Sequence, residues 1–265
     1  MECTESRFLE DVKNHQMIII RNDGLNRHIR FKRPDTICYY FDLITWKGHL
    51  CITGDCGTYV FTRIEDMFAF FRTDKYEKIY PDKKLFINPD YWSGKLVAVD
   101  KVDGYKKFSP DIFEDRIKEY FNEWEFNNDD QKKEVWEEIE NNVLCYCEDS
   151  EYTAYNAAIN YKSDYGHEFS DFWEVDCGEW TFRFLWNCYA IVWGISVFDK
   201  LQDKNKAEKP IHPDIEKYGY FLMYSKSTNN WYAAYDEDSK GAAWYKWNGN
   251  DFDLISRTEL PKDLN

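Results

Sequence analysis

The side chains that could do chemistry are few in this chain, and their spacing matches no reactive motif. His49 with Cys51 and Cys56, or His167 with Cys177, could supply metal ligands only from scattered positions. Structural zinc sites instead pair cysteines two to four residues apart. His49 lies between strand-like segments, which is more typical of a core or turn residue than of a general base. We therefore expect no metal ion and no cofactor.

The carboxylates offer no acid–base pair either. Glu137 and Glu138 are adjacent on a predicted helix, so they point to different faces. Asp214, Glu216 and Lys217 loosely resemble the acidic core of a metal-dependent nuclease, but this spacing is common by chance. No nucleophile elbow, phosphate loop or dinucleotide fingerprint is present. The sequence predicts that the protein is not an enzyme.

The negative charge is confined to one block. Between Glu119 and Glu179, 18 acidic residues accompany only Lys132, Lys133 and Lys162. The difference, 18 − 3, equals the formal net charge of −15 for the whole chain. A field of one sign repels nucleic acid and attracts basic protein surfaces. We therefore expect no direct binding of nucleic acid.

The same block is rich in aromatic residues, which separates it from acidic disordered tails. Tryptophan beside acids can anchor a basic partner surface. Our candidate partner-binding residues are Trp124, Trp136, Glu137, Glu138, Asp171, Trp173 and Glu174. The alternative is that the charges are solvated helix faces and the aromatics form the core stripe.

Helical spacing predicts the elements of this block. Ser109-Pro110 is typical of a helix start, and Phe113, Ile117 and Phe121 follow at helical spacing. The break at 127–130 predicts the start of a second helix, and a third is expected over 149–161. Their apolar stripes are narrow, which favours a helical arm over a thick globule.

The flanking segments differ from the arm. Expected strands lie at 17–20, 28–32, 37–45, 50–53, 58–62, 218–225, 231–235, 242–247 and 252–256. Helices are expected at 5–16, 64–72 and 184–200, and a short one begins at Asn88. Gly54-x-x-Gly57 and Asn248-Gly249 predict hairpin turns.

These elements define an α+β fold with three predicted domains. Residues 1–107 form an N-terminal α+β domain, and residues 108–180 form the acidic helical arm. Residues 181–265 contain a buried apolar helix and a C-terminal antiparallel β meander.

The eight cysteines are expected to be mostly buried thiols. Two pairings stay open, namely Cys51 with Cys56 across a hairpin and Cys145 with Cys147 between chains. The first residues contain no apolar leader, and no run of 18 apolar residues exists. We expect a soluble cytosolic protein.

Two stretches resemble a known family. They are residues 41–72, with Phe41-Asp42-Leu43-Ile44-Thr45-Trp46, and residues 184–194, with Phe184-Leu185-Trp186-Asn187-Cys188. Together they resemble a phage and prophage protein family that includes the inhibitors of the bacterial Gabija defence system. The two stretches cover about a fifth of the chain and do not include the acidic block.

The resemblance implies a non-enzymatic inhibitor that acts in the cytoplasm of the infected bacterial host. It also implies a homo-oligomer that wraps around a host nuclease–helicase complex and keeps DNA from it. Occlusion of the DNA path by the acidic arm, as a mimic of DNA, stays open beside wrapping. Two other classes stay open: a metal-dependent hydrolase acting on nucleotides or a defence signal, and a structural or assembly protein of the phage particle.

Overall fold

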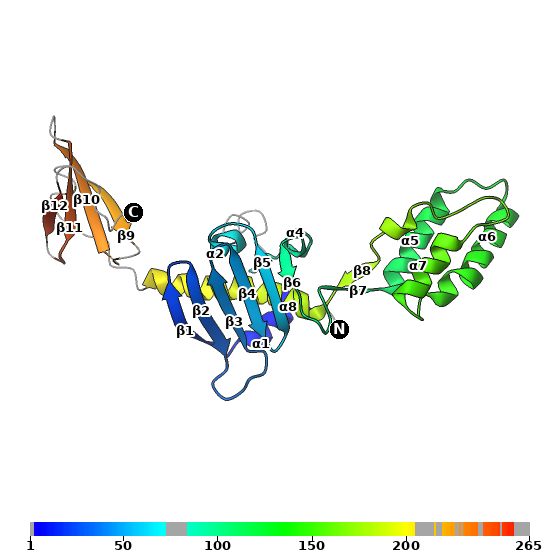
Figure 1. Cartoon of the computed structure of the whole chain (residues 1–265), viewed down its shortest axis with the longest axis horizontal. Helices are drawn as coiled ribbons and strands as arrows, with labels where there is room; N and C mark the ends of the chain where they lie inside the picture. Colours follow the sequence, from blue (N-terminus) through cyan, green and yellow to red (C-terminus); the bar gives the residue numbers. More distant parts are fainter. Residues whose placement is uncertain are drawn as a thin grey trace.

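The computed structural model describes residues 3–72, 84–204, 215, 219–225, 228, 230–237, 241–249 and 251–256. Within these residues the chain forms seven α-helices and twelve strands, and the strands make three antiparallel sheets. This confirms the α+β class. Figure 1 shows a central sheet with its helices, a helical arm, and a C-terminal sheet.

The central sheet is a six-stranded antiparallel meander. Its strands pair in chain order: β1 (Gln16–Asp23), β2 (Asn26–Lys32), β3 (Phe41–Trp46), β4 (His49–Gly54), β5 (Gly57–Thr62) and β6 (Leu96–Ala98). Successive side chains of a strand point to opposite faces. Ile29, Leu43 and Ile52 are aligned across β2, β3 and β4 and are fully buried, so they mark the core face.

The β4–β5 hairpin explains two glycines. Gly57 has φ +93°, a conformation that residues with a Cβ rarely adopt. At Gly54 a Cβ would lie 2.1 Å from the backbone oxygen of Tyr40, so only glycine fits there. The predicted turn is present, but Gly54 is required by the neighbouring chain and not by the turn itself.

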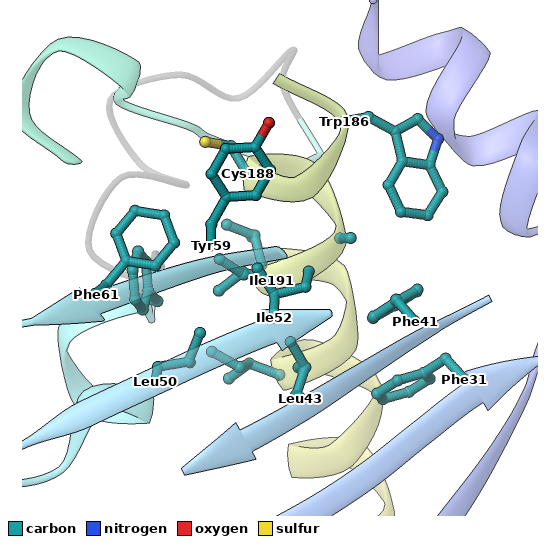
Figure 2. Packing of buried hydrophobic residues seen from close by; sticks show 14 of the residues in the cluster. Phe31, Phe41, Leu43, Leu50, Ile52, Tyr59, Phe61, Trp186, Cys188 and Ile191 are labelled. Carbon is teal, nitrogen blue, oxygen red and sulfur yellow. The ribbon is translucent and has the colours of Figure 1, made fainter. Parts of the chain in front are cut away.

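One face of the central sheet is covered by helices. These are α1 (Glu5–Val12), α2 (Met67–Phe71), α4 (Pro89–Ser93) and the long α8 (Phe182–Lys204). Figure 2 shows strand side chains directed at α8, where Trp186, Cys188 and Ile191 are fully buried. Asn187 is also buried, and its amide donates to the carbonyl of Cys56 at 2.8 Å.

Helix α8 completes the core of the N-terminal unit. The sequence-based division grouped it with the C-terminal strands, whereas its buried side chains share one cluster with β2–β5, α1 and α2. Residues 41–72 and 184–194, which carry the family resemblance, therefore pack against each other. The division of the chain into domains at 107/108 and 180/181 stays a prediction.

Three predicted boundaries differ from the structure for local reasons. The first helix ends at Val12, because β1 begins at Gln16. Helix α2 begins only at Met67, since the Asp66 carboxylate accepts the Phe68 N–H as a cap. Strand β3 begins at Phe41 and not at residue 37, since Tyr39 has φ +57°.

The acidic arm is a three-helix unit with its own core. It contains α5 (Pro110–Glu123), α6 (Asp129–Asn142) and α7 (Glu151–Asn160), with 3₁₀ turns at Leu144–Tyr146 and Phe172–Glu174. Each helix starts at a side-chain cap that accepts a backbone N–H: Ser109, Asn128 and Ser150. The chain enters the arm through β7 (Lys106–Phe108) and leaves it through β8 (Gly178–Trp180), and these two strands pair antiparallel.

The C-terminal sheet is the expected meander. Its order is β12 (Phe252–Ser256), β11 (Gly241–Trp247), β10 (Asn230–Glu237) and β9 (Phe221–Ser225). Asn248-Gly249 lies between β11 and β12, and Gly249 has φ +101° as a hairpin turn requires. Between the other strands of this sheet, residues 226–227, 229 and 238–240 lie outside the described residues.

Candidate functional site

The carboxylates of the arm lie at its surface. Every acidic residue from Glu119 to Glu179 is exposed except Glu138, which is half-buried. Five of the 18 have a cationic partner in the described part of the chain: Glu119, Glu137, Glu168, Asp176 and Glu179. The other thirteen (18 − 5) are not neutralised by a cation among these residues. The arm is therefore a strongly anionic surface.

Aromatic donors orient three carboxylates of α6. The Tyr165 hydroxyl donates to Glu134 at 2.7 Å, and the Trp136 indole N–H donates to Glu140 at 2.7 Å. The half-buried Glu138 accepts from Tyr161 at 3.1 Å. Burial raises the pKa of Tyr161, and the nearby Glu138 carboxylate adds to the shift, so Tyr161 stays a neutral donor. Glu137 remains exposed beside Lys133 at 3.6 Å.

Two of the predicted tryptophan anchors belong to the packing of the arm. Trp124 is half-buried and its ring stacks on His167, with centroids 5.0 Å apart. Trp136 is half-buried against Phe121, with centroids 4.9 Å apart. These rings hold α5 and α6 to the rest of the arm, so at most part of each is open to a partner.

The remaining three predicted residues share one short segment. Asp171, Trp173 and Glu174 lie in and beside the 3₁₀ turn at Phe172–Glu174, where Phe172 is buried and anchors the turn. Trp173 is 65% exposed and both acids are exposed. Asp171 has φ +54°, which reverses the chain ahead of the turn. This segment presents an indole between two carboxylates.

Helix α7 carries an exposed apolar pair that is not among the predicted site residues. Tyr152 is 78% exposed and Ile159 is 48% exposed. They are seven residues apart, which places them on the same side of the helix. Ala154 and Ala158 form the buried side of α7. The two alanines mark the core stripe of the helix. Two large apolar residues outside this stripe could therefore have indicated an exposed apolar surface.

A second polar cluster lies on the face of the central sheet opposite α8. Arg30 donates to Asp42 through two nitrogens, each at 2.8 Å, and the His28 ring lies 2.9 Å from the same carboxylate. Burial favours a raised pKa for Asp42, but the hydrogen bonds from Arg30 and His28 outweigh it and lower the pKa. The cluster is a charge-paired network that spans two strands.

The histidine and cysteine side chains considered as metal ligands or catalytic groups do not form a common site. His49 stacks on Trp46, and its ring Nδ1 lies 3.1 Å from the Lys47 carbonyl oxygen. All eight cysteines are free thiols, and burial raises the pKa of Cys56 to about 12. Across the described ranges no three His, Cys, Asp or Glu side chains are grouped to hold a metal. Asp214, Glu216 and Lys217 lie outside those ranges.

No family model matches the chain, and no solved structure matches it. Human TBC1 domain family member 5 is 23% identical over 154 residues, which is 56% of this chain and 18% of that protein. This chain therefore spans less than a fifth of the length of that relative, and the similarity does not establish a family.

Proposed function

We propose that this chain is a non-enzymatic phage anti-defence protein. It binds a host anti-phage nuclease–helicase complex of the Gabija kind in the host cytoplasm and blocks DNA binding or cleavage. It does so by acidic occlusion or by wrapping, as a homo-oligomer, and it contacts neither nucleic acid nor a membrane. No helix in the described residues is long and apolar enough to cross a bilayer.

The observation that carries the proposal is the anionic arm surface. Helices α5 and α6 have no basic residue in their last turns, where Glu123 and Glu140 lie. Acids at a helix C-terminus oppose the helix dipole and destabilise the helix. A mixed-sign surface would give the same solubility at lower electrostatic cost. This arrangement is therefore better suited to a basic protein surface, such as the DNA path of a nuclease, than to solvation alone.

The test reverses exposed acids and measures inhibition. The arm variant replaces Glu125, Glu137, Glu148 and Glu174 by lysine. The matched control replaces four exposed acids outside the arm: Glu10, Asp35, Glu65 and Asp90. Both variants change the net charge by the same amount. We expect the arm variant to lose binding at least about a hundredfold, as for several facing charge pairs, while the control stays within about threefold.

The readouts are pull-down of the purified nuclease–helicase complex and DNA cleavage by that complex. Circular dichroism shows first that both variants keep their helices. Inhibition by the arm variant equal to wild type would show that the acidic surface is not used.

Salt concentration separates the two modes of inhibition. Occlusion by carboxylates weakens steeply as ionic strength rises, because salt screens exposed charges. Wrapping over a large apolar interface depends little on salt. Binding measured from 50 to about 500 mM salt distinguishes them.

A further inference from the structure

Strand β1 is an edge of the central sheet that no other strand covers among the described residues. Among the described residues it pairs only with β2, so its other side has no strand neighbour. The opposite edge, β6, is only three residues long (Leu96–Ala98). Soluble proteins usually shield a long edge with lysine, proline or a covering element. The first five residues of β1 are instead Gln-Met-Ile-Ile-Ile.

Three consecutive isoleucines of this edge are exposed. Ile18 is 43% exposed, Ile19 is 38% exposed and Ile20 is 51% exposed. Ile18 is opposite Arg30 and Ile19 is opposite Ile29, which is buried on the core face. Neighbouring side chains of a strand point to opposite faces, so apolar surface is exposed on both faces of the edge. A helix docked on one face would cover only half of it, whereas a strand in the plane of the sheet covers both.

The regular part of the edge is nearly self-complementary. The β1–β2 register is continuous from Gln16 to Ile19 and shifts between Ile19 and Arg21. In an antiparallel pair of two β1 strands centred on Ile18, Ile18 faces its own copy and Met17 faces Ile19. These central pairs are apolar, Gln16 faces Ile20 at either end, and each pair projects to one face of the joined sheet. The shift near Ile20 then ends the pairing before Arg21 meets a partner.

We propose that β1 is the self-association edge of this protein, where the β1 strands of two copies pair antiparallel about a two-fold axis at Ile18. The two six-stranded sheets then form one continuous sheet with their helices on the same side. The proposal names the interface of the proposed homo-oligomer but is independent of the defence target. Because a five-residue edge buries a modest area, we expect a reversible monomer–dimer step.

The first test measures molar mass by sedimentation from about 1 to 100 µM of the full chain, a range that covers weak dimers. The edge variant is Ile18→Lys with Ile19→Lys, which places like charges across the two-fold axis. The control is Ile37→Lys with Ile64→Lys, at two isoleucines that are 72% and 43% exposed. We expect the edge variant to raise the dimer dissociation constant at least about tenfold and the control to leave it unchanged. A monomeric wild type, or an edge variant that dimerises like wild type, overturns the proposal.

The second test fixes the register by a disulfide. Directly opposite residues of an antiparallel pair have Cα atoms about 4.5–5.5 Å apart, within the range for a disulfide. In a background with the exposed Cys38 and Cys145 changed to serine, Ile18→Cys should give a covalent dimer on mild oxidation. Ile64→Cys should not. Equal yields at both positions overturn the symmetric pairing. Both tests use the chain alone, so their failure is distinct from failure of the inhibition assay.

Discussion

At the scale of single residues, Asp42 shows how the central sheet keeps a charge out of water. Its side chain is 6% exposed, and Arg30 and His28 surround it with hydrogen bonds. Arg30 is itself 40% exposed, so solvent weakens the pairing on that side. The carboxylate is nonetheless stable as a charge only while those donors remain in place. Its lowered pKa is the measurable result of this arrangement.

Acid should therefore remove the contribution of Asp42 to stability. Because its pKa is lower in the folded than in the unfolded chain, the contribution is complete above the unfolded value of 3.8 and is lost as pH falls through the folded value. Asp42→Asn should cost about 2 kcal/mol of unfolding free energy at pH 7, as for a hydrogen-bonded charge. Urea unfolding of both proteins from pH 7 to 2.5 tests this. A difference that persists undiminished at the lowest pH would contradict it.

At the scale of elements, the contact between α8 and the central sheet depends on one small residue. A Cβ at Gly194 would lie 2.8 Å from Leu43 Cδ1 and 3.1 Å from Phe31 Cε2. Glycine is otherwise costly inside a helix, by about 1 kcal/mol relative to alanine. Its presence lets the helix approach β2 and β3 closely enough for Trp186 and Ile191 to be buried. Close packing at this position outweighs helix propensity.

Gly194→Ala should thus destabilise the protein although alanine is the better helix former. Overpacking costs about 1–3 kcal/mol and the gain in helix propensity is about 1 kcal/mol, so the net loss of stability is up to about 2 kcal/mol. Gly94→Ala is the control, since its Cβ would meet only the Tyr91 oxygen at 3.7 Å. Thermal unfolding of both variants gives the comparison. A higher melting temperature for Gly194→Ala would show that the contact relaxes.

At the scale of the whole molecule, the central unit and the acidic arm each have an apolar core of their own. The central unit buries α8 against its sheet, and the arm buries a separate cluster that includes Phe113, Ile139 and Phe172. The two clusters share no buried residue. Since β7 pairs with β8, the two ends of the arm lie side by side. The arm thus meets the requirements for folding without the rest of the chain.

A fragment of residues 105–181 should fold alone. We expect helical circular dichroism and a cooperative thermal transition, with lower stability than in the full chain because a small domain buries less of its surface. Fragment 105–181 with Phe113→Ala is the control and should lose several kcal/mol, which unfolds a marginal domain. A wild-type fragment without a cooperative transition would show that the central unit is needed to stabilise the arm.

Local signals made much of the fold predictable. Ser109 and Asn128 cap helices through bonds to residues three positions on, so the sequence shows where α5 and α6 start. The position of α8 was not predictable, because its partners in β3 are more than a hundred residues away in the chain. The same limit applies to the candidate site. Exposure of Trp173 and partial burial of Trp124 depend on packing between helices, which charge and composition do not encode.

The arm is joined to the central unit at the β7–β8 ribbon. Its base is fixed to the central unit, since the Tyr59 hydroxyl donates to the Gly104 carbonyl at 2.8 Å and Arg183 pairs with Asp103 at 3.0 Å. Helix α5, which follows the ribbon in the chain, has 14 residues. Its length is therefore about 21 Å at 1.5 Å per residue. A rotation of about 10° at the ribbon would carry the far end of such a helix about 4 Å. A rotation of that size at the six paired residues of the ribbon would therefore displace the anionic surface by more than the length of a hydrogen bond.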